Sequence, residues 1–154
     1  MADKIYLADI IEERLDKAEE KLQGETEEEG ELEDVEEVVR GEHVRGKPKT
    51  PTIWIFTDTV NTEGEPTSMR ESWILPLVVV SVVYDSQDAR RGQKKATELA
   101  AKARSVLLKS RNLDLKGKVH GVRSITFEPR GRFTEGSGVF SAACVLSVSF
   151  TTLE

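Results

Sequence analysis

The sequence predicts an α+β domain in which two helices pack on one face of a mostly antiparallel sheet. Three observations support this fold class. Apolar residues recur every three or four positions in two stretches, 3–22 and 88–108, as in amphipathic helices. Apolar runs rich in β-branched and aromatic residues, typical of strands, lie on either side of the second stretch. The last of these runs, 139–151, has one fully apolar face, as in a half-buried strand.

The first helix is expected over residues 3–22. Asp3 is placed to cap its start, and Gly24 is placed to end it. Its apolar stripe comprises Ile5, Leu7, Ile10, Ile11, Leu15, Ala18 and Leu22.

Residues 25–37 contain nine acidic residues and no basic one. The chain has 28 acidic and 22 basic residues, so the remainder has a net charge of about +3. We therefore expect an acidic loop or insertion at about 23–47 that is solvated or mobile. Within this insertion, Val35, Val38 and Val39 could form one short apolar contact, on a helical turn or a strand.

Two strands are expected over 50–60 and 68–84, paired antiparallel. From Trp73 to Tyr84 both faces of the second strand are apolar, so both faces should be covered. We expect the helices to cover one face and a second subunit to cover the other. Pro76 cannot donate a ladder hydrogen bond, which favours an edge position or a bulge.

The second helix, over 88–108, has Asp85, Ser86 and Asp88 as candidate N-caps. Two strands follow, 119–128 and 139–151, as a second hairpin whose connecting loop should be mobile at its tip. The last strand has one fully apolar face. The predicted order is therefore α–β–β–α–β–β in a single domain over 1–154. The second helix buries Ala96, Leu99, Ala100, Ala103, Val106 and Leu107.

The sequence indicates neither an enzyme nor a metal or cofactor site. His43 and His120 lie in different segments, without a second ligand at metal-like spacing. Ser137 lies between two strands, whereas a nucleophile elbow joins a strand to a helix. Cys144 is the only cysteine, so it cannot form an internal disulfide, and we expect a small buried hydrophobe.

Membrane and nucleic-acid partners are not indicated either. No apolar run reaches the length of a membrane-spanning helix, and the N-terminus lacks the pattern of a signal peptide. The expectation is a protein made in a cytoplasm. The near-neutral charge outside 25–37 argues against DNA binding through a basic face.

Two groups of residues are candidates for a protein interface. Arg130, Arg132 and Phe133 lie in the loop between the last two strands, and arginine and aromatic residues are enriched at interface centres. A solvated hairpin tip is the equal alternative. Arg90 and Arg91 belong, with Lys94 and Lys95, to a basic cluster at the start of the second helix. Positive charge there opposes the helix dipole. This is mildly costly unless an acidic partner lies nearby, such as segment 25–37 of the same or a neighbouring chain.

The acidic segment is a third candidate surface. It lacks the alternating ligands and central glycine of a calcium-binding loop, and a solvated loop is the simplest interpretation. If it lined a channel, it would repel DNA phosphates and let a duplex slide through. The lumen-facing or partner-facing candidates are Glu27, Glu28, Glu29, Glu31, Glu33 and Asp34.

Two stretches of this chain carry a family resemblance. They are ILPLVVVSVVYDSQDARRGQKKATELAAKARSVLL and VHGVRSITFEPRGRFTEGSGVFSAACVLSVSF. Their order and hydrophobic pattern resemble the tail terminator proteins of long-tailed bacteriophages, also called tail completion or tail-to-head joining proteins. The resemblance covers about 50–152, with 3–22 matching the family's first helix, and involves no invariant motif.

The resemblance implies a virion structural protein at the head–tail interface, assembled in the host cytoplasm. Such a protein forms a homohexameric ring that caps the tail tube and offers a surface to the head connector or neck protein. DNA passes through the lumen without sequence-specific binding. The alternatives are a neck, head-completion or tail-tube protein of the same virion. A small cytoplasmic ligand-binding α+β domain is an alternative of a different class.

Overall fold

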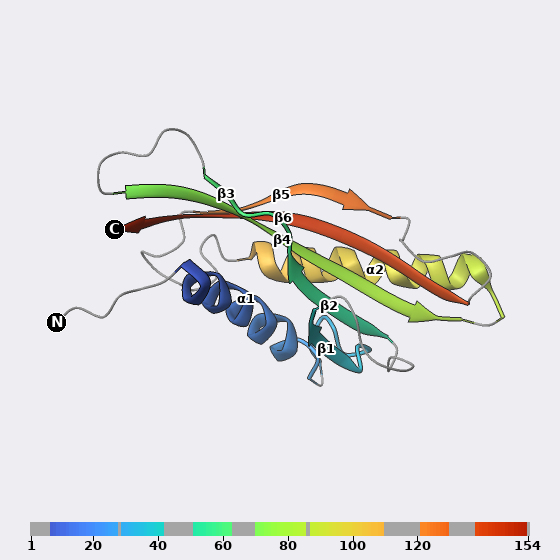
Figure 1. Cartoon of the computed structure of the whole chain (residues 1–154). Coiled ribbons are helices and arrows are strands. Elements are labelled where there is room, and N and C mark those ends of the chain that lie inside the picture. The colour runs from blue at the N-terminus through green and yellow to red at the C-terminus, as the bar shows by residue number, and fades with distance from the viewer. Residues whose placement is uncertain are drawn as a thin grey trace.

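The computed structural model describes residues 7–27, 29–41, 51–62, 70–85, 87–109, 121–129 and 138–153. It has an α+β fold with two helices and a mixed sheet (Figure 1). The elements in chain order are α1 (Leu7–Gly24), β1 (Glu37–Arg40), β2 (Thr52–Thr57), β3 (Asn61–Thr62), β4 (Arg70–Tyr84), α2 (Ala89–Leu108), β5 (Gly121–Glu128) and β6 (Val139–Leu153).

The sheet has the order β1-β2-β4-β6-β5, and β3 pairs with β4 beyond the end of β2. Its centre is the antiparallel pair β4–β6, which runs in unbroken register from Arg70 opposite Leu153 to Tyr84 opposite Val139. The predicted antiparallel pairing of the two middle strands is confirmed by β2 and β4, and the second hairpin is confirmed by β5 and β6. Only β1 runs parallel to its neighbour, β2.

The predicted order α–β–β–α–β–β omits two short strands. β1 has 4 residues and β3 has 2, and runs this short show no readable periodicity. β1 also directly follows the acidic run, whose composition favours a loop. The remaining elements correspond to the predicted ones, with boundaries shifted by a few residues at most where they are described.

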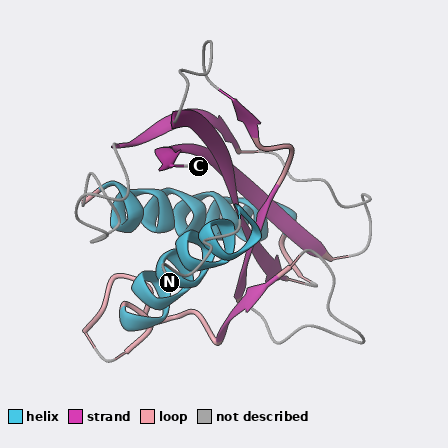
Figure 2. Cartoon of the chain, turned by 60° about the vertical axis from the view of Figure 1, so that its left-hand side comes forward, coloured by secondary structure: helices cyan, strands magenta, loops and turns pink. Residues whose placement is uncertain are grey.

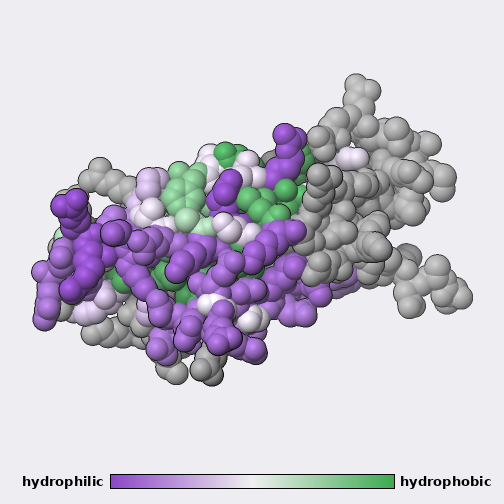
Figure 3. Space-filling model, turned by 180° about the vertical axis from the view of Figure 1, so that it is seen from behind, coloured by the Kyte–Doolittle hydropathy of each residue, from purple (hydrophilic) through white to green (hydrophobic). Residues whose placement is uncertain are grey.

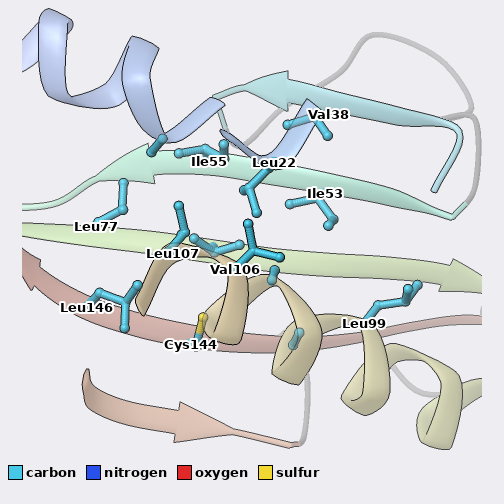
Figure 4. Packing of buried hydrophobic residues seen from close by; sticks show 14 of the residues in the cluster. Leu22, Val38, Ile53, Ile55, Leu77, Leu99, Val106, Leu107, Cys144 and Leu146 are labelled. Atoms are coloured by element: carbon cyan, nitrogen blue, oxygen red, sulfur yellow. The ribbon is translucent and has the colours of Figure 1, made fainter. Parts of the chain in front are cut away.

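One face of the sheet carries both helices (Figures 1 and 2). The buried residues of α1 and α2 form one cluster with alternate residues of β2, β4 and β6, and Figure 4 shows their side chains between α2 and the strands. All six residues predicted to face the core from α2 are buried. The predicted apolar face of β6 is also buried from Ala142 to Phe150, including Cys144.

The opposite face of β4 is buried as well at Val78, Val80 and Val82, whereas Tyr84 on that face is 43% exposed. Its side chains form a second apolar cluster, and none of its buried members is more than 7% exposed in the single chain. The prediction that both faces are covered is therefore confirmed for the middle of β4. Whether a second subunit covers the rest of this face stays a prediction. The buried members of this cluster are Trp54, Val78, Val80, Val82 and Ala143.

Pro76 lies in the central strand β4, opposite Ser147 of β6. Its carbonyl oxygen accepts a hydrogen bond from Oγ1 of Thr57 at 2.8 Å, so the side of Pro76 without a donor faces β2 and β3. On that side, Thr57 pairs with Leu77 and Asn61 pairs with Ile74. The segment that joins β2 to β3 is therefore one residue longer than the part of β4 beside it. The predicted edge position is therefore wrong. β4 itself has no bulge at Pro76, because its register with β6 is unbroken, and the irregularity lies between β2 and β3 instead.

Candidate assembly interface

The start of α2 displays the predicted basic cluster. Asp88 caps the helix, because its side chain accepts a hydrogen bond from the backbone N–H of Arg91 at 3.1 Å. The carboxylate of Asp85 accepts further backbone bonds from Gln87 and Asp88, each 3.0 Å long. This turn therefore supplies negative charge at the helix N-terminus, which offsets the unfavourable position of the basic side chains that follow.

Arg91 forms a two-point ion pair with Asp85. Its Nε lies 2.7 Å from Oδ2 and its Nη2 lies 3.1 Å from Oδ1. The Arg91 guanidinium and the backbone donors hold the pKa of the Asp85 carboxyl well below its usual range. Arg91 is thus engaged within its own turn. Arg90 is exposed and forms no ion pair with any residue that the structure describes, so of these two arginines it is the better contact candidate.

The acidic segment lies along α2. Lys95 Nζ is 2.6 Å from Oδ2 of Asp34, and Lys109 Nζ is 2.6 Å from Oε1 of Glu31. Lys95 lowers the pKa of the Asp34 carboxyl, and Glu31 raises the pKa of the Lys109 amine. The expectation that segment 25–37 partners the basic cluster is therefore confirmed for Lys95, within the same chain. For Arg91 the partner is Asp85 instead.

The segment is also anchored by apolar residues. Leu32, Val35 and Val38 belong to the main core, so the expectation of a solvated segment holds for its exposed carboxylates and not for these side chains. Glu27, Glu29 and Glu33 are exposed, whereas Glu28 lies outside the described residues. Whether these acids face a lumen stays a prediction, and two of the candidates, Glu31 and Asp34, are neutralised within the chain.

A third ion-pair group joins β1 to α1. Arg40 Nη2 lies 2.8 Å from Oε2 of Glu12, and Arg40 Nη1 lies 2.5 Å from Oδ1 of Asp16. Glu19 Oε2 lies 3.9 Å from the same Nη1. Burial lowers the pKa of Arg40, but the hydrogen bonds and charges of Glu12 and Asp16 outweigh it, and the net shift is upward. Arg40 could not be identified from the sequence, because its partners lie more than twenty residues away in the chain.

Several sequence candidates lie outside the described residues. These are the loop residues Arg130, Arg132 and Phe133, together with His43, His120 and Ser137. Cys144 is described: it is free and fully buried. Burial raises the pKa of its thiol to about 12, so it carries almost no thiolate at neutral pH, and the prediction of a small buried hydrophobe is confirmed.

A surface that the sequence did not predict lies between α2 and β5. An open groove of about 310 Å³ lies there. Ile125 lines it and is 54% exposed, because the register shifts between Ser124 and Thr126 and leaves Ile125 without a partner on β6. Figure 3, seen from behind, shows hydrophobic residues next to a hydrophilic band on the surface. The groove is lined by Ala101, Arg104, Ser124, Ile125, Thr126 and Phe127.

The bulge at Ile125 left no clear signal in the sequence. Val122 and Phe127 both pack against the main core, five residues apart, and in a regular strand two residues an odd number of positions apart face opposite sides. The odd spacing between these two apolar residues was therefore the one indication in the sequence that the strand is irregular. Arg104 is placed by a hydrogen bond from its Nε to Oγ of Ser124 at 3.0 Å, which brings α2 and β5 together at the groove.

Two absences among the described residues concern metal binding and membrane insertion. No group of three or more potential metal ligands is found among them. Neither helix in the described part of the chain is long and apolar enough to span a membrane.

Comparisons with known proteins do not assign a family. A scan against protein-family models found no match, and a search of curated proteins found none either.

Proposed function

We propose that this protein is a ring-forming structural subunit of a virion, a tail terminator that caps the tail tube and joins it to the head connector. In this role the protein performs no reaction. Its partners are further copies of itself, the tail tube protein, and the connector or neck protein, and DNA passes through the ring. The resemblance of residues 50–152 to tail terminators provides the starting point.

The observation that carries the proposal is the difference between the two ends of the sheet. At one end is β1, a 4-residue strand that runs parallel to its neighbour and follows the acidic segment. At the other end is β5, an antiparallel strand of 8 residues with a bulge and an exposed isoleucine. Copies that associate through two unlike surfaces do so head to tail, and head-to-tail contacts produce closed rings or helical tubes.

Surface charge supports the passage of DNA. Glu27, Glu29 and Glu33 are exposed and form no ion pair with a cation in the described part of the chain. A ring with such acids near its lumen would repel the phosphate backbone and prevent DNA from sticking. The basic side chains Lys95 and Lys109 are already paired with acids of the same chain.

Electron microscopy of the purified protein, combined with native mass spectrometry, tests the proposal. We expect closed rings of six subunits with a lumen wide enough for a DNA duplex, alone or when tail tubes are supplied as a template. Long tubes would instead indicate a tail-tube protein. A compact dimer without a lumen, unchanged by tail tubes, would contradict the ring and favour a small binding domain.

A further inference from the structure

The two end strands of the sheet differ in the charge of their exposed side chains. Arg123 of β5 is exposed, and Arg104 borders the adjoining groove. Neither arginine forms an ion pair with a carboxylate among the described residues. β5 has one acid, Glu128, at the opposite end of the strand from Arg123. Arg104 thus places a positive charge at the open groove, which also contains the exposed apolar side chain of Ile125.

At the other end of the sheet the exposed charge is negative. Glu36 and Glu37 lie at the start of β1, and both are exposed. No described cation pairs with either of them. The two ends therefore have complementary charge, and each lacks a partner of opposite sign within the described part of its own chain.

The two charges also lie on the same face of the sheet. Val38 packs into the helix-side core, so its neighbour Glu37 points to the opposite face. Val122 packs into the same core, so Arg123 likewise points away from the helices. If the sheet continued from one copy into the next, Glu37 and Arg123 would lie on one shared face.

Strand direction fits such a continuation. β1 is parallel to β2, and each further step through β4, β6 and β5 is antiparallel. β5 therefore runs opposite to β1. When a second copy is placed beside the first in the same orientation, its β1 meets β5 as an antiparallel pair, which is the more stable pairing.

We propose that β5 of one copy pairs with β1 of the next copy, with Arg123 beside Glu37 on the face away from the helices, Arg104 near Glu36 on the helix side, and Ile125 providing the apolar contact. The inference rests on the proposed ring and names its subunit contact. The occupant of the groove side of β5 is thus a second copy of this chain. The bulge in β5 and the charges on both end strands disfavour unspecific strand pairing. The end of opposite charge is therefore the favoured partner.

Disulfide trapping tests this contact directly. Glu37→Cys and Arg123→Cys are made as separate variants, mixed, and oxidised; Cys144 is fully buried and should not interfere. We expect a cross-linked dimer in the mixture and little in either variant alone. A mixture of Lys94→Cys and Glu98→Cys, both on the exposed side of α2, is the matched control and should give no cross-linked dimer under the same oxidation.

Charge reversal provides the second measurement. Glu37→Lys and Arg123→Glu should each weaken self-association by roughly tenfold or more, and the double variant should recover most of that loss. Lys94→Glu, a reversal of the same kind outside the contact, should have little effect. Recovery in the double variant cannot result from misfolding, because a misfolded chain would not regain association.

The possible outcomes distinguish a failure of the proposed β5–β1 contact from a failure of the proposed ring function. Cross-links in Arg123→Cys alone would mean that two β5 strands pair with each other, which overturns the inference. Rings without mixture-specific cross-links would leave the ring function standing and overturn this contact. Mixture-specific cross-links in a protein that forms open filaments and no rings would support the contact and overturn the proposed function.

Discussion

The centre of the sheet and its acidic end are held together by different forces. β4 and β6 pair over 15 residues each, with apolar side chains buried on both faces. β1 pairs over 4 residues, and its own Arg40 binds α1. The acidic segment before it is held by ion pairs to Lys95 and Lys109 as well as by a few buried apolar residues. Exposed ion pairs are screened by salt, whereas apolar burial is not. The difference indicates a rigid centre and an end whose attachment depends partly on solution conditions.

Equal truncations in the two regions give the largest expected effects. Leu146 of β6 and Leu32 of the acidic segment are both 0% exposed. Leu146→Ala should lower the free energy of unfolding by about 2–5 kcal/mol, and Leu32→Ala by an amount near the lower end of that range, because the outer segment can relax into the space. Urea unfolding measures both, and Ile125→Ala, which removes an exposed side chain, is the control. A loss below about 0.5 kcal/mol for Leu32→Ala would contradict its place in the core.

A glycine substitution tests the acidic segment without touching a charge. A Cβ added at Gly30 would overlap the backbone carbonyl of Glu25, so the turn before Leu32 would have to shift. Gly30→Ala should destabilise the protein by about 1–3 kcal/mol. Gly24→Ala is the matched control, since a Cβ there meets no atom within 4 Å. Equal stability of the two variants would show that the turn adapts freely.

Removing the attachment of β1 to α1 should have a smaller and salt-dependent effect. Arg40→Gln loses the contacts to Glu12 and Asp16, whose side chains are 62% and 69% exposed. We expect a loss of about 0.2–1 kcal/mol at low salt that shrinks at high salt. Hydrogen exchange should show faster opening of β1 with unchanged protection of β4 and β6. Arg90→Gln is the control, and a loss that persists in high salt would contradict the electrostatic explanation.

The weakest expected effect is a pH dependence of the Lys95–Asp34 pair. The folded pKa of Asp34 is lowered, so the pair stabilises the fold above the ordinary carboxyl pKa of about 4. This contribution is lost as pH falls through the lower folded pKa. The difference in urea midpoint between wild type and Lys95→Met should therefore be present at pH 7 and vanish in acid. Lys94→Met should show no such trend, and a difference that persists at pH 2 would reject the assignment.

The main elements could be predicted because their patterns are long. The α2 stripe from Ala96 to Leu107 and the alternation of β6 each extend over several repeats, so the apolar faces were identified correctly. The residues Leu32 and Val35 were harder, because single apolar residues among acids give no period. Their burial depends on α1, α2 and β2 converging from elsewhere in the chain.

The candidate contact surface was less predictable than the fold. The charges of Arg90, Arg91 and the acidic segment are evident from the sequence. The ion pair between Asp85 and Arg91, and the lack of described carboxylate partners for Arg104 and Arg123, are not. Those properties depend on distances between residues far apart in sequence. The bulge at Ile125 is a similar case, because one extra residue in a strand changes which side chains face outward without changing the composition.

The order β4-β6-β5 has a consequence for how the chain folds. β6 lies between two strands that both precede it in the sequence, and its far end pairs Arg70 with Leu153. Contacts of such long sequence separation form slowly. During synthesis, the edge of β4 therefore stays unpaired until β6 has left the ribosome. An unpaired strand edge can pair with strands of other chains and aggregate. We therefore expect the central pair β4–β6 to form before the end strands β1 and β5 associate with another copy.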